Sequence, residues 1–329
     1  MLPRKRVVFL LTGGTIAMTP AGGRVLLPSE GVDLLGDVPE LAQIADIEQK
    51  PLFHVDSADM LPASWVRVAE EVHRAFSVHG ADGVVIVHGT DTMAYGASLV
   101  AFLLGPLPGP VVFTGAQKPL SDVRTDARQN LVDATLVATM ALPEVVIAFG
   151  ARAYRGVGST KVDAFGFEAF TSPNVAPLVT FGTGIEVSPA VRSPHALGPL
   201  DLRLDTRVAA LRVVPGLTAD TVRAVLGSGA RGLVLSTYGT GTLPGGLVPA
   251  LESARDADVV VLAVSQCLRG HIDLGRYEAG AAAEAAGVVS GGGMTVEAAL
   301  AKTMVGLARH ESPDTLRAYL LADTLGELA

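Results

Sequence analysis

Short, uniformly apolar runs recur along this 329-residue chain, and each of them ends in a turn. They are rich in valine and isoleucine, and they lack the alternation with polar residues that marks a half-exposed sheet. Runs of this kind are typical of strands that are buried on both faces of a parallel sheet. The clearest are Val7–Leu11, Val84–Val87, Val111–Phe113, Val145–Phe149, Leu233–Leu235 and Val259–Val264.

Helix-like stretches separate several of these runs, at Ala63–Phe76, Thr92–Leu104, Arg124–Met140 and Ala219–Leu226. Repeated alternation of strand and helix is typical of doubly wound α/β architecture. The length of the chain predicts two domains, at roughly 100–200 residues for each. We therefore predict an α/β fold with two doubly wound, Rossmann-like domains, of which the N-terminal one is larger.

The domain boundary is visible as a change of composition. Residues 183–206 lose the apolar runs and gain proline, which is typical of a connector or of edge hairpins. The strand–helix pattern then starts again. We predict a first domain over residues 1–190 that carries the catalytic residues, a linker over 191–207, and a second α/β domain over 208–329.

Composition and charge argue against several classes of partner. The formal net charge is −8, and no basic run extends beyond Arg4-Lys5-Arg6, so we expect no nucleic-acid partner. The longest apolar stretches fall far below the ~18–20 residues of a membrane-spanning helix, so we expect no membrane partner. Thr12-Gly13-Gly14 interrupts the apolar run near the N-terminus too early for a signal peptide, which predicts a cytoplasmic protein.

The sequence also argues against a metal site. Cys267 is the only cysteine, which excludes internal disulfides and thiolate-rich zinc sites. No pair of histidines has the spacing of a zincin helix. We expect neither a metal nor an organic cofactor.

The residues that follow the predicted strands carry the chemistry. Ligands of open α/β sheets bind beyond the carboxyl ends of the strands. The segments found there are Thr12-Gly13-Gly14-Thr15, His88-Gly89-Thr90-Asp91 and Thr114-Gly115-Ala116-Gln117, and Ser159-Thr160-Lys161 comes later. A threonine hydroxyl attacks only when a base removes its proton, and a lysine held by an aspartate can act as that base. Glycines bring backbone N–H groups to a developing oxyanion. The pattern predicts nucleophilic acyl transfer.

Each of these features also has a purely structural interpretation. The Gly13-Gly14 pair is common in tight turns and nucleotide sites. Thr90 and Asp91 could cap the following helix, and His88 fits a hydrogen-bonded residue at a strand end better than a base. Cys267 fits a small hydrophobic residue better than a reactive thiol. The features favour chemistry only in combination.

In combination, the motifs resemble the bacterial-type L-asparaginases over nearly the whole chain. Thr12–Ala17 matches the first signature of that family, and Val87–Met93 matches the second. Further matches indicate the cytoplasmic type I branch. They are Asp56–Met60, Thr114–Gln117, Tyr154–Gly156, Thr160-Lys161, Phe170–Asn174, Gln266-Cys267 and Met294–Ala298.

The resemblance implies hydrolysis of the side-chain amide of L-asparagine to L-aspartate and ammonia. It makes Thr15 the primary nucleophile, which forms an acyl-enzyme. It makes Thr90, Asp91 and Lys161 a triad that relays protons to Thr15 or to the hydrolytic water. It leaves open which threonine attacks first.

The resemblance also implies where the substrate binds. Asp56, Ser57 and Asp91 hold its α-carboxylate and α-amino groups, and the backbone of Ala116 lies near its amide. Ala58 stands at the position of a glutamine that contacts substrate in type II enzymes, which changes the affinity for asparagine or glutamine.

Two departures from the family pattern stand out. Many members carry a tyrosine on the loop after the first signature, but the aligned position here is Arg24 and the segment Met18–Pro28 has no tyrosine. Tyr277 is our candidate for the hydroxyl donor that replaces it.

The second departure concerns regulation. In type I enzymes, the region matched by Thr160, Thr242, Cys267 and Glu297 resembles an allosteric asparagine pocket. Thr242 stands where an asparagine is expected, which argues against such regulation.

Three alternatives remain beside an L-asparaginase. One is a broader asparaginase and glutaminase. Another is a subunit of a tRNA-dependent amidotransferase, which is expected to carry a further domain before the motif that here contains Thr15. The third is a catalytically inactive amino-acid-binding homologue. The resemblance also implies a homodimer or homotetramer, in which the smaller domain of a neighbouring subunit closes the site.

Overall fold

An eight-stranded sheet forms the centre of the first part of the chain. The computed structural model describes residues 4–17, 20–21, 24–25 and 33–329. The chain divides into two compact units, residues 1–202 and residues 203–329. Each unit has its own sheet, so each is described by itself.

The sheet of the first unit has the strand order β12-β11-β8-β7-β6-β5-β1-β4. The five strands from β4 to β7 are parallel, whereas β8, β11 and β12 pair antiparallel at one end. Two short hairpins, β2–β3 and β9–β10, lie outside it. The bounds are β1 Arg6–Gly13, β2 Pro20–Ala21, β3 Arg24–Val25, β4 Asp46–Val55, β5 Gly83–Val87, β6 Val111–Thr114, β7 Val145–Phe149, β8 Arg152–Arg155, β9 Thr160–Lys161, β10 Phe170–Thr171, β11 Val179–Phe181 and β12 Ile185–Val187.

The strand order locates the functional end of the sheet. Numbered along the chain, the five parallel strands lie in the order second, first, third, fourth, fifth. This is the flavodoxin-like order, in which the chain winds in opposite directions from the gap between the first and third strands. Here that gap lies between β1 and β5. The loops after these two strands therefore diverge at the switch point, where doubly wound folds bind ligands.

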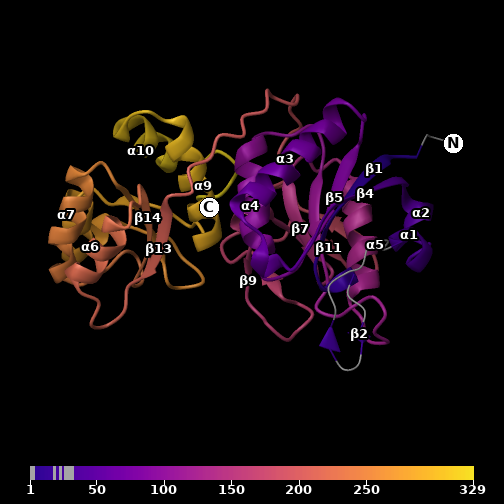
Figure 1. Ribbon diagram of the computed structural model, residues 1–329, viewed down its shortest axis with the longest axis horizontal. Coiled ribbons are helices and arrows are strands. Elements are labelled where there is room, and N and C mark those ends of the chain that lie inside the picture. The colour runs from indigo at the N-terminus through magenta and orange to yellow at the C-terminus, as the bar shows by residue number, and fades with distance from the viewer. Residues whose placement is uncertain (1–3, 18–19, 22–23, 26–32) are drawn as a thin grey trace. The chain divides into compact units, whose positions relative to one another are not determined.

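Helices cover both faces of this sheet (Figure 1). The helices α3 and α4 pack together on one face, and α2 and α5 pack together on the other. The bounds are α1 Leu34–Asp37, α2 Leu41–Ile44, α3 Pro62–Ser77, α4 Met93–Leu104 and α5 Ala127–Ala138.

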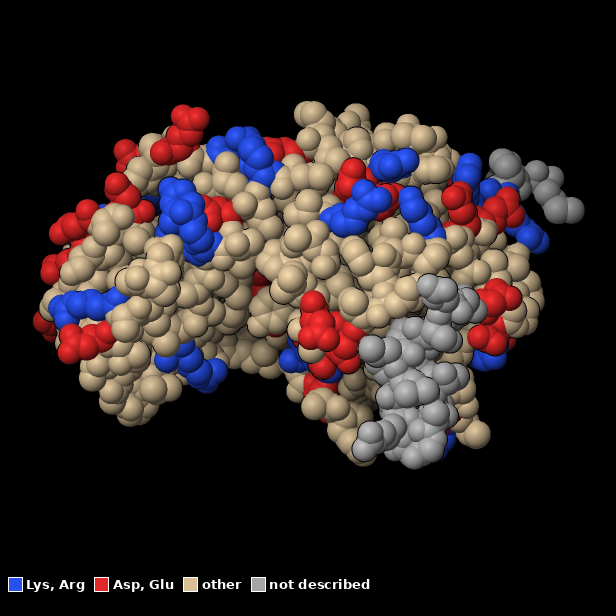
Figure 2. All heavy atoms as spheres, in the orientation of Figure 1, with Lys and Arg blue, Asp and Glu red and all other residues tan. Residues whose placement is uncertain are grey.

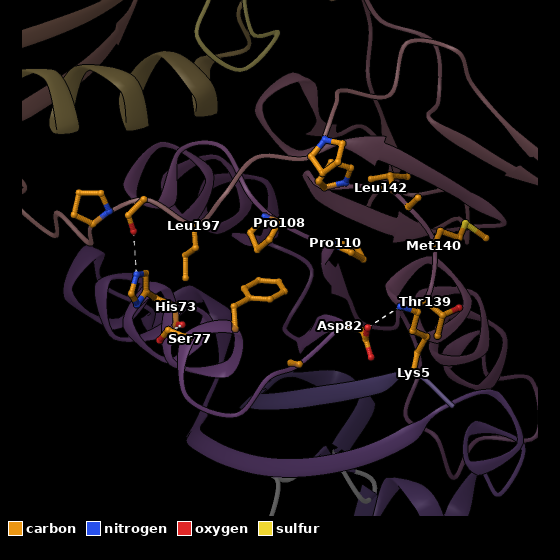
Figure 3. Close-up of a pocket in the computed structure, with 18 residues that line it drawn as sticks. Lys5, His73, Ser77, Asp82, Pro108, Pro110, Thr139, Met140, Leu142 and Leu197 are labelled. Atoms are coloured by element: carbon orange, nitrogen blue, oxygen red, sulfur yellow. Dashed lines mark hydrogen bonds and ion pairs between the residues drawn. The ribbon is translucent and has the colours of Figure 1, made fainter. Parts of the chain in front are cut away.

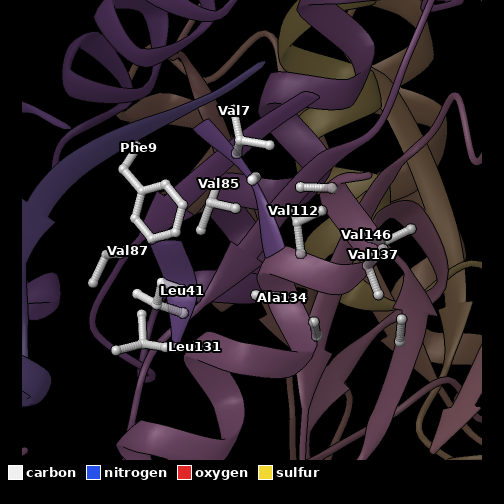
Figure 4. Close-up of a cluster of buried hydrophobic side chains, with 14 of the residues drawn as sticks. Val7, Phe9, Leu41, Val85, Val87, Val112, Leu131, Ala134, Val137 and Val146 are labelled. Carbon is white, nitrogen blue, oxygen red and sulfur yellow. The ribbon is translucent and has the colours of Figure 1, made fainter. Parts of the chain in front are cut away.

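Burial on both faces explains the uniform apolar runs. Val7 and Phe9 of β1 belong to the cluster that also contains Leu131 and Ala134 of α5 (Figure 4). Successive side chains of a strand point to opposite faces. Val8 and Leu10 therefore face α3 and α4, and the four β1 side chains are each at most 3% exposed.

The second unit contains four parallel strands in the order β13-β14-β15-β16. Side chains from α6, α7 and α8 join one hydrophobic cluster with β14 and β15, and α9 packs on β13, β14 and β15. The bounds are β13 Val208–Arg212, α6 Ala219–Gly227, β14 Gly232–Thr237, α7 Val248–Asp256, β15 Val260–Ser265, α8 Glu278–Ala285, β16 Val289–Ser290, α9 Val296–Arg309 and α10 Pro313–Leu321.

The predicted fold class is confirmed. All six apolar runs are strands, and the four predicted helices are α3, α4, α5 and α6. Within residues 183–206, β12 forms an edge hairpin with β11, and residues 188–207 contain neither helix nor strand. No helix in the described ranges is both long and apolar enough to cross a bilayer. On the face shown in Figure 2, Lys and Arg side chains lie scattered among Asp and Glu.

A cavity of about 870 Å³ opens in the first unit (Figure 3). Its lining includes Lys5, Asp82, Pro110 and Pro143, which precede β1, β5, β6 and β7. It therefore lies at the amino ends of the parallel strands, whereas the predicted chemistry lies at their carboxyl ends.

Candidate active site

The turn after β1 is built from two glycines at which a side chain would be strained and would clash with neighbouring backbone. Gly13 and Gly14 have φ values of +109° and +89°, which L side chains rarely adopt. A Cβ atom on Gly13 would lie 2.4 Å from the Val55 carbonyl oxygen, and one on Gly14 would lie 2.5 Å from the Gly89 nitrogen. Thr15 follows as the first residue of a 3₁₀ turn, Thr15–Ala17, and is partly buried.

The loops after β1 and β5 are held against each other. The Thr12 hydroxyl donates a hydrogen bond to the Val87 carbonyl oxygen at 3.0 Å, which joins the ends of the two strands. The close approach of Gly14 to Gly89 brings the backbone beside Thr15 into contact with the backbone before Thr90. The two predicted threonines are thus carried by adjoining loops at the switch point.

Three of the predicted site residues form one hydrogen-bonded group. Lys161 is the last residue of β9, and its Nζ atom donates to Thr90 Oγ1 at 2.8 Å and to Asp91 Oδ1 at 2.7 Å. The Lys161 side chain is 19% exposed, whereas that of Asp91 is 68% exposed. The amine therefore lies on the shielded side of the ion pair, beside the threonine hydroxyl.

Gln117 extends this group, although we did not predict it as a site residue. The Thr90 hydroxyl donates to Gln117 Oε1 at 3.3 Å, and Gln117 Nε2 donates to the Gly166 carbonyl oxygen at 3.1 Å. Asp163 accepts the N–H groups of Gly166 and Phe165, and these bonds lower the pKa of its carboxyl group. Gln117 therefore links Thr90 to the turn that follows Lys161. Its place in a strand-end motif was the available sequence signal.

The loop after β4 reaches the same edge of the sheet. Val55 pairs with Gly13, so Asp56 and Ser57 emerge beside the turn before Thr15. The Asp56 carboxylate accepts the Ala58 N–H at 2.9 Å and caps the 3₁₀ turn Ser57–Asp59. Ser57 is buried, while Ala58 is exposed.

Neither Thr90 nor Asp91 caps the next helix. The N-cap residue of α4 is Thr92, and its hydroxyl donates to the Ser57 carbonyl oxygen at 2.7 Å instead of capping. This bond ties the start of α4 to the loop after β4. Thr90 and Asp91 are thereby available to Lys161.

The interpretation of His88 as a hydrogen-bonded strand-end residue is confirmed. Trp65 Nε1 donates to His88 Nε2 at 3.0 Å, and His88 Nδ1 lies 2.7 Å from the Gly89 carbonyl oxygen. Complete burial lowers the pKa of His88 to about 4. A neutral imidazole with both nitrogens engaged is not available as a general base.

The turn after β6 contains Ala116, which is buried. Asp126 accepts the N–H groups of Gln117 and Lys118, and the Asn130 amide donates to the Gly115 carbonyl oxygen at 3.0 Å. These bonds fix the backbone around Ala116.

The candidate for the replacement hydroxyl, Tyr277, and the position that lacks the tyrosine, Arg24, lie in different parts of the chain. Tyr277 belongs to the second unit, where it is 56% exposed and precedes α8. The Arg276 guanidinium lies 5.9 Å from the centre of its ring. Arg24 begins β3, but its side chain and most of the segment 18–28 lie outside the described residues.

The predicted effector residues are divided between the units. Thr160 is in β9 of the first unit; Thr242 pairs with Tyr238 in the second, and Glu297 is buried in the first turn of α9. Cys267, which we interpreted as a small hydrophobic residue and not as a reactive thiol, is exposed. It lies two residues beyond the end of β15, outside the core, with its N–H bonded to Ser265 Oγ.

Among the described residues, no group of three or more His, Cys, Asp or Glu side chains is arranged to hold a metal ion. The predicted site residues Thr15, Thr90, Asp91 and Lys161 offer hydroxyl, carboxylate and amine groups. A lysine amine bonded to a threonine hydroxyl is the arrangement expected for proton transfer in covalent catalysis.

Comparison with known proteins agrees with this chemistry. Residues 6–192 match the model of the asparaginase N-terminal domain, and residues 207–320 match that of the glutaminase/asparaginase C-terminal domain. The chain is 36% identical to L-asparaginase 1 of Escherichia coli K12, with 99% of each chain covered.

Solved structures give the same result. L-asparaginase I from Vibrio cholerae is 33% identical, with 99% of each chain covered and a TM-score of 0.90. The thermostable L-asparaginase from Thermococcus kodakarensis is 34% identical, with a TM-score of 0.88 and coverage of 98% of this chain and 99% of that one. The chain therefore belongs to the asparaginase family and resembles its type I members.

Proposed function

We propose that this protein hydrolyses the side-chain amide of L-asparagine to L-aspartate and ammonia through a threonine nucleophile. The observation that carries the proposal is the bonding of Lys161 to Thr90 and Asp91, beside the loop that bears Thr15. The similarity to L-asparaginases over the full chain supports the same reaction.

In the first step, the Thr15 hydroxyl oxygen attacks the amide carbon while its proton leaves to a base. The tetrahedral intermediate collapses, the C–N bond breaks, and the amine takes a proton and leaves as ammonia. An aspartyl ester of Thr15 remains. The triad of Thr90, Asp91 and Lys161 supplies and accepts these protons, which is the role that its hydrogen bonds support.

In the second step, water attacks the ester carbon and releases aspartate from Thr15. The same triad accepts the proton of the water, and the threonine oxygen takes a proton as the C–O bond breaks. Thr90 is an alternative first nucleophile, because its hydroxyl is the one bonded to Lys161. Rapid quenching followed by peptide mapping distinguishes the two, since the ester would remain on one threonine.

The α-amino and α-carboxylate groups of the substrate would contact Asp56, Ser57 and Asp91. Asp56 and Ser57 emerge next to the Gly13 turn, and Asp91 is largely exposed, which supports this assignment. The Ala116 backbone would lie near the substrate amide. Ala58 lacks the side-chain amide with which the glutamine of type II enzymes contacts the substrate.

Three further points belong to the proposal. Tyr277 is the candidate for the hydroxyl that the loop lacks. Thr160, Thr242, Cys267 and Glu297 match the effector region of type I enzymes, but Thr242 in place of the expected asparagine argues against regulation by asparagine. The protein is a cytoplasmic homodimer or homotetramer. A sigmoidal dependence of rate on asparagine concentration would support the effector pocket, whereas a hyperbolic one would oppose it.

The test is ammonia release from L-asparagine, L-glutamine and their D-enantiomers, measured over a range of concentrations. We expect the highest kcat/KM for L-asparagine. Equal kcat/KM values for L-asparagine and L-glutamine would indicate a broader asparaginase and glutaminase instead. Ammonia release from none of the four would contradict the proposed function.

A further inference from the structure

The proton on His88 can be located from its neighbours. The indole N–H of Trp65 is a donor only, and it lies 3.0 Å from His88 Nε2. Nε2 must therefore present its lone pair. In the neutral imidazole the proton is then on Nδ1, which donates to the Gly89 carbonyl oxygen at 2.7 Å. Trp65 thus determines the tautomer, and the tautomer determines the bond to Gly89.

The surroundings of the ring keep it in this state. The centre of the ring lies 6.3 Å from that of Trp65 and 5.7 Å from that of Phe113, and the residue is 1% exposed. The backbone N–H of His88 is bonded to the Thr114 carbonyl oxygen at 2.8 Å. Both ends of the residue are therefore held, and its imidazole cannot turn without losing a hydrogen bond in a dry environment.

The Gly89 backbone, whose carbonyl oxygen accepts the hydrogen bond from His88, lies where the loops that carry Thr15 and Ser57 meet. A Cβ atom on Gly14 would lie 2.6 Å from Gly89 Cα, and a Cβ atom on Gly89 would lie 2.6 Å from Ser57 Oγ. The Gly89 backbone is thus packed between the loop that carries Thr15 and the loop that carries Ser57. A rotation of its peptide would displace both loops.

The same peptide directs Thr90. The structure has no cis peptide bonds in its described part, and in a trans peptide the N–H points opposite to the C=O. Because the Gly89 carbonyl points at the buried imidazole, the Thr90 N–H points away from it. The bond from His88 therefore sets the direction of the Thr90 N–H and the position from which the Thr90 hydroxyl meets Lys161.

We propose that His88, with its tautomer set by Trp65, is a positioning residue for the reaction, because its Nδ1–H holds the Gly89–Thr90 peptide in its working orientation. It neither touches substrate nor transfers a proton. The inference rests on the proposed asparagine hydrolysis. It deepens that proposal by assigning a role to the histidine of the second signature, Val87–Met93.

Two amide substitutions separate this role from simple packing. In His88→Asn, the side-chain NH₂ stands near the position of Nδ1 and can still donate to the Gly89 carbonyl oxygen. In His88→Gln, the amide stands near the position of Nε2, where it can accept from Trp65 but cannot reach Gly89. His73→Gln is the control, because His73 lies on the same helix as Trp65 but contacts Gly198 at the cavity of Figure 3.

We expect His88→Gln to lower kcat about tenfold or more, which corresponds to the loss of one buried hydrogen bond. The ratio kcat/KM should fall by the same factor, because the bond acts on the reacting groups. His88→Asn should recover most of the loss, and His73→Gln should match the wild type. A kcat for His88→Gln equal to that of the wild type, or an equal loss in His88→Asn, would overturn the inference.

A measurement on the unsubstituted protein covers the case in which a variant does not fold. Nitrogen-15 NMR of protein with labelled histidine reports which ring nitrogen carries the proton. At neutral pH we expect a neutral His88 with the proton on Nδ1. A proton on Nε2, or on both nitrogens, would overturn the inference. Wild-type protein that releases no ammonia would instead contradict the proposed function, while the tautomer would still be measurable.

Discussion

The Nζ atom of Lys161 lies 2.8 Å from Oγ1 of Thr90, and the Thr90 hydroxyl in turn lies 3.3 Å from Oε1 of Gln117. Since Lys161 donates to the Thr90 oxygen, the hydroxyl proton is free to point to Gln117. The hydroxyl therefore has one orientation before reaction. Proton transfer to a neutral Lys161 would require only that this proton turn from Gln117 to the amine.

Lys161→Met should abolish most ammonia release without unfolding the protein. Loss of a group that moves protons lowers kcat by about 10²–10⁴-fold. Its ion pair with the largely exposed Asp91 contributes only about 1 kcal/mol or less to stability. Steady-state ammonia release and thermal unfolding test both statements.

Lys5→Met is the matched control for this lysine. Lys5 also forms a 2.7 Å ion pair with an aspartate, Asp82, but at the amino ends of the strands. We expect its kcat to equal that of the wild type. An equal loss of activity in both variants would show that the effect of Lys161→Met is not specific to the site.

Gln117→Leu should lower kcat about tenfold, less than Lys161→Met does. The variant keeps the size of the side chain but removes the acceptor of the Thr90 proton and the donor to Gly166. A single hydrogen bond contributes about 1 kcal/mol, which sets the expected size of the effect. A rate within experimental error of the wild type would show that Gln117 does not orient Thr90.

Gly14→Ala should reduce both activity and stability. Its Cβ atom would lie 2.5 Å from the Gly89 nitrogen, and its φ of +89° adds strain of about 1–2 kcal/mol. A displacement of about 1 Å between the loops can lower the rate about 10²-fold. Kinetics and urea unfolding measure the two losses.

Gly80→Ala is the control that introduces backbone strain at a positive φ without a steric clash. Gly80 has a φ of +61°, but a Cβ atom there would meet nothing within 4 Å. We expect a loss of about 1–2 kcal/mol in the free energy of unfolding and an unchanged kcat. If Gly14→Ala behaved like Gly80→Ala, the contact between Gly14 and Gly89 would have no importance for catalysis.

The stability of the protein should depend on pH through His88. Burial holds its pKa at about 4 in the folded chain, against 6.5 as the ordinary value. Between these values the unfolded chain binds a proton that the folded chain does not. The free energy of unfolding therefore falls as the pH is lowered from 6.5 to 4, by up to about 3 kcal/mol, and this contribution is constant above 6.5.

Urea unfolding of the wild type and of His88→Asn over this pH range isolates the contribution of the histidine, because the carboxyl groups are common to both proteins. The free energy of unfolding of the wild type should fall toward low pH relative to that of His88→Asn, because only the wild type loses stability through this histidine. Parallel curves would contradict the assignment of a buried, neutral His88.

In the second unit, Lys302→Met should be strongly destabilising. Lys302 and Glu327 form an ion pair in which both side chains are fully buried. Burial alone would raise the pKa of Glu327, but the charge of Lys302 and the N–H of Leu325 lower it overall. Removal of one partner from a buried pair costs about 3–5 kcal/mol. The double variant Lys302→Met/Glu327→Gln should lose less, as denaturant unfolding can test.

Strand ends made much of the site predictable. Buried parallel strands are visible as apolar runs, and the residues that follow them must lie at one edge of the sheet. Thr15, Thr90 and Asp91 could therefore be placed together from the sequence. Pairing with a carboxylate does not by itself distinguish Lys161, because Lys50 and Lys302 form ion pairs with the buried carboxylates of Glu71 and Glu327.

Other features depend on packing that leaves no local pattern. The strand β4 lies at the sheet edge with partly exposed residues, so it has no apolar run. The bond between Trp65 and His88 depends on how α3 is rotated on the sheet. Gln117 joins the triad only because the turn after Lys161 returns to it. Spacing along the sequence contains none of this information.

The most direct test of the central claim is ammonia release from L-asparagine by Thr15→Ala, beside the wild type and Thr139→Ala. Thr139 lies at the end of α5 and lines the cavity at the opposite edge of the sheet. The account predicts that Thr15→Ala folds normally but releases ammonia at a rate lower by several orders of magnitude, whereas Thr139→Ala matches the wild type. Near-normal ammonia release by Thr15→Ala would contradict it.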